Sequence, residues 1–144
     1  MRKKLTRRAL YAVFAATILL PKHLEAEIGP KRPISPAEIW SRTELFFGSS
    51  RPNGTVVDDA EFAKFVDEEV TRRFPDGLTL LTGYGQFKNS AGTIIREKSF
   101  VLILFYPAQT IDANKKIQEI REAYKVANSQ ESVLRADNYS IISF

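Results

Sequence analysis

The side chains that could carry out chemistry are a small set of arginine, glutamate and glutamine residues beside the predicted turns: Arg51, Gln86, Arg96, Glu97, Gln130 and Glu131. Arginine binds carboxylates and phosphates through paired N–H donors, so Arg51 or Arg96 could hold an anionic ligand. Glu97 could act as a general acid or base if partial burial raised its pKa. The same residues could equally form surface ion pairs, which contribute little to stability. The residue types alone leave both interpretations open.

Several other chemistries are excluded by composition. The chain has no cysteine, and its one histidine is His23, inside the N-terminal segment described below. Ser-His-Asp and Cys-His mechanisms are therefore excluded from the rest of the chain, as are zinc sites that need thiolate or imidazole ligands. The Gly/Ser-rich stretch 48–54 lacks the spacing of a phosphate-binding or dinucleotide-binding loop. We expect no metal and no cofactor.

The N-terminus has the three-part pattern of a secretory signal peptide. Met1 to Arg8 is basic, Ala9 to Leu20 is an apolar run that ends at Pro21, and Leu24-Glu25-Ala26 resembles a small-residue cleavage site. The run is short for a membrane span, so no stable span is expected after cleavage. We expect a signal peptide over 1–26 and a periplasmic or secreted protein; a retained N-terminal membrane anchor is the alternative.

The rest of the chain divides into an extended, proline-rich linker over 27–39 and one domain over 40–144. Six basic residues and only one acidic residue precede Ala26, while the whole chain has a net charge of +4. The remainder is therefore close to neutral, which argues against nucleic acid as a partner.

The predicted elements are organised around the apolar run from Ser99 to Tyr106, which reads as a central strand. Strands are predicted over 40–48, 78–87, 93–106 and 133–144, and helices over 58–74 and 111–128. Asp58 and Glu61 form a capping-box-like start to the first helix. We expect Gly83 and Gly85 to weaken the second strand, so that it is an edge strand or contains a bulge, and Asp137-Asn138 to interrupt the last strand. This order predicts a ferredoxin-like α+β fold, with an antiparallel 4-1-3-2 sheet and both helices on one face.

The central strand is apolar on both faces, although the fold covers only one of them. Val101, Ile103 and Phe105 alternate with the residues expected to face the helices. A second copy of the chain is the simplest cover, giving a homodimer through the open sheet face; a bound apolar ligand or the segment 27–39 are alternatives. The same topology brings the six polar candidate residues to one end of the sheet.

The sequence also resembles a known family. The landmarks are Thr43-Glu44-Leu45-Phe46-Phe47-Gly48, Arg51-Pro52-Asn53-Gly54, Phe74-Pro75-Asp76-Gly77-Leu78-Thr79, Gly85-Gln86, Arg96-Glu97 and Gln130-Glu131-Ser132-Val133. Together they resemble the bacterial family called domain of unknown function 3574, over about residues 40–144. The family favours tryptophan after Gly-Gln, where this chain has the aromatic Phe87. The resemblance implies a small, often exported bacterial protein and assigns no catalytic residue.

Two functional hypotheses follow. The first is a non-enzymatic, exported domain that self-associates or binds a partner or ligand. The second is an enzyme or binder of a small anionic molecule, with Glu97 as acid/base and Arg96 or Arg51 as anion clamp. Strand alternation places Arg96 and Glu97 on opposite faces of the sheet, which argues against their sharing one pocket.

Overall fold

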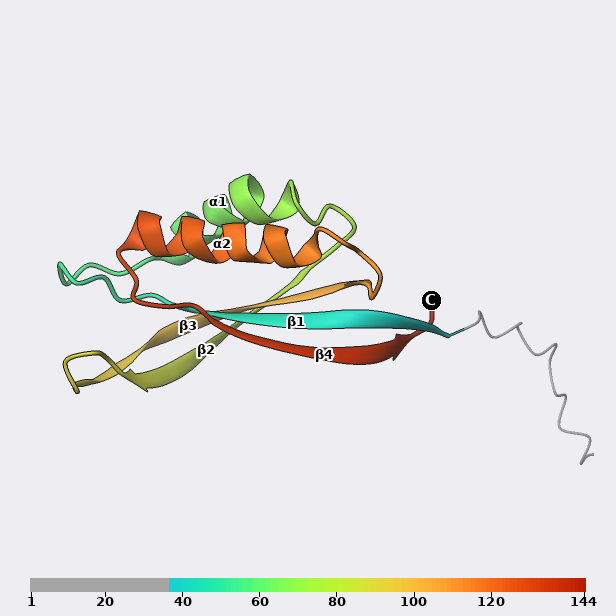
Figure 1. Ribbon diagram of the computed structural model, residues 1–144. Helices are drawn as coiled ribbons and strands as arrows, with labels where there is room; N and C mark the ends of the chain where they lie inside the picture. Colours follow the sequence, from blue (N-terminus) through green and yellow to red (C-terminus); the bar gives the residue numbers. More distant parts are fainter. Residues whose placement is uncertain (1–36) are drawn as a thin grey trace, which may run out of the picture. The chain divides into compact units, whose positions relative to one another are not determined.

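The computed structural model describes residues 37–144, which form a four-stranded antiparallel sheet with both helices on one face (Figure 1). The elements are β1 (Glu38–Gly48), α1 (Asp59–Phe65), a π-helical segment η1 (Val66–Thr71), β2 (Thr79–Lys88), β3 (Ile94–Pro107), α2 (Ala113–Asn128) and β4 (Leu134–Ile142). The strand order is β2-β3-β1-β4, which confirms the predicted 4-1-3-2 sheet. The predicted signal peptide and residues 27–36 of the predicted linker lie outside the described residues.

Strand alternation builds the core between the sheet and the helices. On β1 and β3, Leu45, Phe47, Phe100, Leu102 and Leu104 are buried beneath the helices. The helices contribute a matching apolar surface, in which the Phe62 ring stacks on Phe100 at 4.0 Å between centroids. Aromatic rings at such distances contribute beyond the area they bury.

The first helix starts as predicted but changes type along its length. Asp58 accepts a hydrogen bond from Glu61 N, and the Glu61 side chain accepts one from Asp58 N, which completes the capping box. After Phe65 the backbone forms the π-helix η1. Buried apolar residues recur every four positions, at Phe62, Val66, Val70 and Phe74. An α-helix repeats every 3.6 residues, so this spacing would drift off the core, whereas a wider π turn keeps it in line.

One sequence expectation about the edge strands needs correction, and one is confirmed. β4 runs without a break from Leu134 to Ile142, and Asp137 pairs with Thr43 of β1. Asp137 is accommodated within the strand because its carboxylate accepts hydrogen bonds from Thr43 Oγ1 at 2.5 Å and from Arg135 Nε at 3.0 Å. β2 is an edge strand, as predicted, and Gly83 and Gly85 stay in regular register with Ser99 and Glu97.

The second face of the sheet, here called the open face, is not covered by any element of residues 37–144. Apolar side chains from all four strands lie on it: Trp40, Phe46, Leu81, Phe87, Ile95, Val101, Ile103, Phe105, Leu134 and Ile142. Near its centre, Arg42 and Glu44 form an ion pair at 2.5 Å, and the Arg42 guanidinium lies 5.6 Å from the Phe105 ring centroid. The open face is therefore largely apolar, with one internally neutralised charge pair near its centre and the Glu97 carboxylate towards the loop end.

Candidate functional site

The loop after β1 is a compact, hydrogen-bonded turn that leads into α1. Ser49 N donates to Lys98 O at 3.2 Å, and Val57 N donates to Ser49 O at 2.8 Å. Arg51 N donates to Thr55 O at 2.9 Å, and Gly54 adopts the left-handed backbone (φ 83°) that suits glycine. These bonds fix where the Arg51 side chain leaves the loop.

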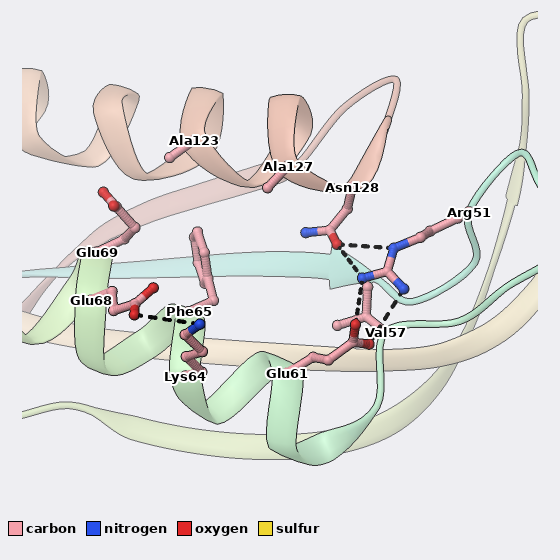
Figure 2. A pocket seen from close by; sticks show the side chains of 10 residues that line it. All are labelled: Arg51, Val57, Glu61, Lys64, Phe65, Glu68, Glu69, Ala123, Ala127 and Asn128. Carbon is pink, nitrogen blue, oxygen red and sulfur yellow. Dashed lines mark hydrogen bonds and ion pairs between the residues drawn. The ribbon is translucent and has the colours of Figure 1, made fainter.

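A groove between the first helical segment and α2 lies on the outer side of the helix layer (Figure 2). Its volume is about 360 Å³; Phe65 and the small side chains Ala123 and Ala127 help to line it. Glu68 pairs with Lys64 at 3.8 Å along its wall. The sequence analysis missed this groove, because alanines within a helical stripe indicate packing rather than an open space.

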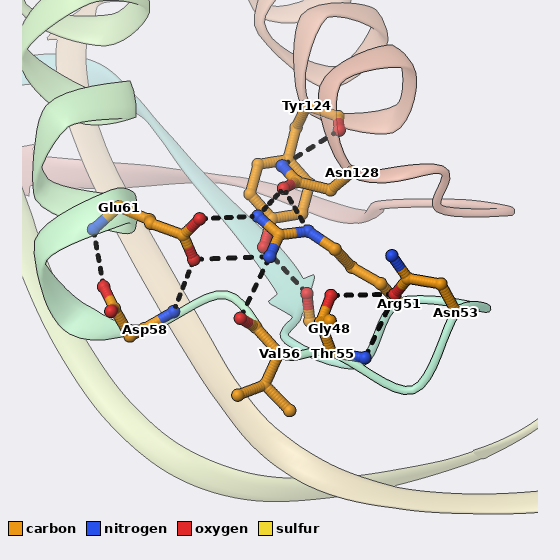
Figure 3. Close-up of polar contacts among 9 residues, drawn as sticks. All are labelled: Gly48, Arg51, Asn53, Thr55, Val56, Asp58, Glu61, Tyr124 and Asn128. Carbon is orange, nitrogen blue, oxygen red and sulfur yellow. Dashed lines mark hydrogen bonds and ion pairs between the residues drawn. The ribbon is translucent and has the colours of Figure 1, made fainter.

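Arg51 closes one end of this groove, and its guanidinium is fully used (Figure 3). Nε and Nη2 donate to Asn128 Oδ1 at 3.1 and 2.8 Å. Nη1 donates to Val56 O at 3.0 Å, and Nη1 and Nη2 donate to the two carboxylate oxygens of Glu61 at 3.3 and 3.1 Å. All five N–H donors of the guanidinium have partners. Arg51 therefore joins the β1–α1 loop, α1 and α2, and keeps no donor for an anionic ligand.

The partners of Arg51 set the electrostatics of this end. The hydrogen bonds from Arg51 are the largest cause that lowers the pKa of Glu61, and the bond from Asp58 N adds to it. Tyr124 packs beneath the cluster and donates its hydroxyl to Gly48 O at 2.8 Å. Burial raises the pKa of Tyr124, and the nearby Glu97 carboxylate adds to the rise. Tyr124 is therefore a neutral hydrogen-bond donor here.

Arg96 and Glu97 lie on opposite faces of β3, as alternation predicts. Glu97 lies on the open face, and its Oε2 accepts a hydrogen bond from Ser50 N at 2.6 Å. Arg96 is exposed on the other face, opposite Gln86 of β2. The exposed Tyr84 neighbours this pair on that face. Gln86 and Arg96 thus lie on the opposite face of the sheet from Glu97.

Gln130 and Glu131 connect the turn after α2 to the other two loops. Gln130 Nε2 donates to Ser50 O at 2.5 Å. The Glu131 carboxylate accepts hydrogen bonds from Ser90 N at 3.2 Å and Ser90 Oγ at 2.9 Å. The structure therefore brings Arg51, Glu97, Gln130 and Glu131 around Ser50, which the sequence analysis did not single out.

A second, smaller cavity lies where these three loops meet. Its volume is about 190 Å³, and its walls and floor include Ser50, Pro52, Phe87, Ile95, Gln130 and Glu131. Phe87 and Ile95 belong to the open face and are partly exposed. The loop end of the sheet thus offers an apolar floor with polar walls.

Within residues 37–144, no three acidic, histidine or cysteine side chains are grouped so that they could hold a metal ion. In the same range, no helix is long and apolar enough to cross a membrane.

The sheet, its helices and the loop-end cavity define a small α+β domain with an open sheet face. Residues 42–144 match the family model described as "Protein of unknown function (DUF3574)", so the chain belongs to that family. This confirms the resemblance seen in the sequence. A comparison with curated proteins gave no match.

Two solved structures share the fold. One is a phage SAM lyase in complex with S-methyl-5'-thioadenosine, with a TM-score of 0.60, 14% sequence identity, and coverage of 80% of this chain and 94% of the lyase chain. The other is a phage SAM lyase in the apo state, with a TM-score of 0.57, 14% identity, and coverage of 78% and 93%. At this identity the similarity shows a common fold and nothing more about function.

Proposed function

We propose that this domain is an exported, non-enzymatic module that self-associates through the open face of its sheet. The observation that carries the proposal is the second apolar face of β3. Val101, Ile103 and Phe105 remain partly exposed there, and all four strands contribute apolar neighbours. Contiguous apolar surface of this kind marks an interaction site in a folded protein.

The chemistry of the open face favours a second copy as its occupant. Its central charges are one cation and one anion, Arg42 and Glu44, two residues apart on the same strand. A two-fold axis can place such a pair against its own copy with opposite charges facing each other.

The size of the face is also adequate. The strands β1, β2, β3 and β4 contain 11, 10, 14 and 9 residues. At about 3.4 Å per residue and about 4.8 Å between strands, the flat area of the sheet is roughly 700 Å², and the accessible area of the side chains on the face is larger. A standard stable interface buries about 800 Å² per partner, which is the same order.

The export part of the proposal depends on the basic and apolar N-terminal residues. Mass spectrometry of the protein purified from its own cells tests it. A mature chain that starts near Glu27 supports export with cleavage, and a chain that still carries Ala9 to Leu20 contradicts cleavage.

The test of self-association is the solution mass of the full chain, measured by light scattering after size exclusion. We expect the mass of two chains for the natural sequence and for the control Val126→Lys, which alters an exposed residue of α2. We expect the mass of one chain for Ile103→Lys, because a charge would enter the centre of the apolar face. Leu81→Lys, at the more exposed margin of the same face, repeats the test if Ile103→Lys does not fold. The proposal is contradicted if the natural protein has the mass of one chain, or if the Ile103→Lys variant keeps the mass of two chains.

A second candidate is a small-molecule binder or enzyme that uses the loop end of the sheet. The observation that favours it is the shared fold with a lyase whose structure holds S-methyl-5'-thioadenosine. Titration of the full chain with that compound, followed by thermal unfolding, tests the candidate. A rise in Tm that saturates as the compound is added supports the candidate. An unchanged Tm at every concentration excludes this compound as a ligand.

A further inference from the structure

We propose that the loop-end cavity beside Ser50 and Glu131 binds a small molecule with one ring, or of similar size, that carries an amino group. This inference rests on the second candidate function and names its ligand chemistry. Its floor, Phe87 and Ile95, also belongs to the open face, so the inference requires that self-association leave this end of the face uncovered.

The cavity is held in shape before any ligand arrives. Its walls come from three segments far apart in the sequence: the β1–α1 loop, the β2–β3 hairpin and the turn after α2. The hydrogen bond from Gln130 Nε2 to Ser50 O joins the first to the third, and the bonds from Ser90 to Glu131 join the second to the third. Glu97 holds Ser50 N from the sheet below. A preformed site avoids the entropy cost of ordering loops on binding.

The floor and volume limit the size of the ligand. Phe87 and Ile95 present partly exposed apolar surface, and Pro52 adds to it from the β1–α1 loop. The volume of about 190 Å³ is near the ~150 Å³ of a cavity that holds benzene, and below the ~300 Å³ at which drug-sized sites begin. One ring or a short branched chain fits this space.

The polar walls determine which charge the ligand can carry. They favour a cation, whereas the sequence analysis expected an anionic ligand. Arg51 lies at the wall, but its five donors already serve Glu61, Asn128 and Val56. The Glu131 carboxylate accepts two hydrogen bonds from Ser90 and has about four acceptor sites, so it can accept more. Glu97 adds a second negative charge two residues along β3 from Ile95. The site therefore favours a cationic hydrogen-bond donor.

The test compares three probes with the same ring: benzylamine, benzyl alcohol and benzoate. Binding to the full chain is followed by NMR, through the amide and side-chain signals of Phe87, Ile95 and Gln130. We expect benzylamine to bind about tenfold more tightly than benzoate, with benzyl alcohol between them, because a charged hydrogen bond contributes more than a neutral one. Benzoate that binds as well as benzylamine, or no shift of these signals with any probe, overturns the inference.

A matched pair of variants locates the charge effect. Glu131→Gln keeps an acceptor for Ser90 and removes the charge, so the preference for benzylamine over benzoate should fall to about threefold or less. Glu68→Gln removes the same charge beside Lys64 on the helix side and should leave the preference unchanged. Equal preferences in both variants contradict a role for Glu131.

The outcomes also separate this inference from the function on which it rests. If S-methyl-5'-thioadenosine binds and benzylamine does not, the ligand class is wrong and the second candidate function stands. If neither binds, both fail. If S-methyl-5'-thioadenosine does not bind, but benzylamine binds more tightly than benzyl alcohol and benzoate, the inference holds and that nucleoside is not the ligand.

Discussion

The carboxylate of Glu97 on β3 lies directly against the Cα of Gly48 at the end of β1. A Cβ at position 48 would overlap Oε1 of Glu97, whose Oε2 accepts the hydrogen bond from Ser50 N at 2.6 Å. Gly48 does not have a left-handed backbone. Its role is therefore to leave room for the carboxylate that holds the β1–α1 loop.

The first prediction is that Gly48→Ala destabilises the domain because it displaces the Glu97 carboxylate. We expect a loss of about 1 kcal/mol in the free energy of unfolding, since the charged hydrogen bond to Ser50 N is lost and only part of that is offset by the stiffer unfolded chain. Urea unfolding measures the change.

A double-mutant cycle provides the control. In a Glu97→Ala background the carboxylate that would overlap the new Cβ is absent. Gly48→Ala should then leave the stability unchanged or stabilise the domain by about 0.5 kcal/mol. Gly85→Ala is the matched glycine control, because its Cβ would meet Ser99 at an ordinary 3.5 Å. Equal costs for Gly48→Ala in both backgrounds would show that Glu97 is not the cause.

The second prediction is that Arg51 is a structural residue. Arg51→Ala should destabilise the domain by about 2 kcal/mol, because it leaves the buried Asn128 Oδ1 without its donors and leaves Glu61 with only the bond from Asp58 N. Arg72→Ala removes an exposed arginine paired with Glu69 and should change the stability by less than about 0.5 kcal/mol. The midpoint of urea unfolding measures both; similar midpoints for the two variants would argue against the role of Arg51.

The third prediction concerns pH. Arg51 lowers the pKa of Glu61 in the folded protein below its ordinary value of 4.5. Ionised Glu61 therefore contributes stability above pH 4.5, and the contribution is lost as the pH falls through the lowered folded-state pKa. The natural chain should be more stable than Glu61→Gln at pH 7, and the difference should shrink steadily below pH 4.5.

Urea unfolding of both proteins between pH 7 and pH 3 measures this difference. Glu68→Gln is the control, because its carboxylate pairs with Lys64 at a long 3.8 Å and both side chains are exposed. A gap between the natural chain and Glu61→Gln that stays constant across this range would contradict the assigned role of the Arg51–Glu61 contact.

The strand order and the helix cap could be predicted because each depends on local sequence pattern. The doubly apolar run from Phe100 to Phe105 requires an internal strand, and a β-α-β-β-α-β chain with right-handed crossovers has one simple way to provide it. The capping box needs only Asp58 and Glu61, three residues apart.

The composition of the candidate site could be predicted only in part. The topology brings the three loops to one end, but the partners of each side chain depend on distances between segments 40 to 80 residues apart. Nothing in the sequence marks Asn128 as the partner of Arg51, apart from its position at the end of a predicted helix. The four-residue spacing of Phe62, Val66 and Val70 is compatible with the π-helix. An α-helix also tolerates this spacing over two turns, so the spacing alone does not predict the π-helix.

Thiol labelling tests whether a second copy of the chain covers the open face. The chain has no cysteine, so Ile103→Cys and Val126→Cys each report one position. If a second copy covers this face, the labelling rate at position 103 falls as the protein concentration rises, while the rate at position 126 stays constant. Equal and concentration-independent rates at both positions would contradict it.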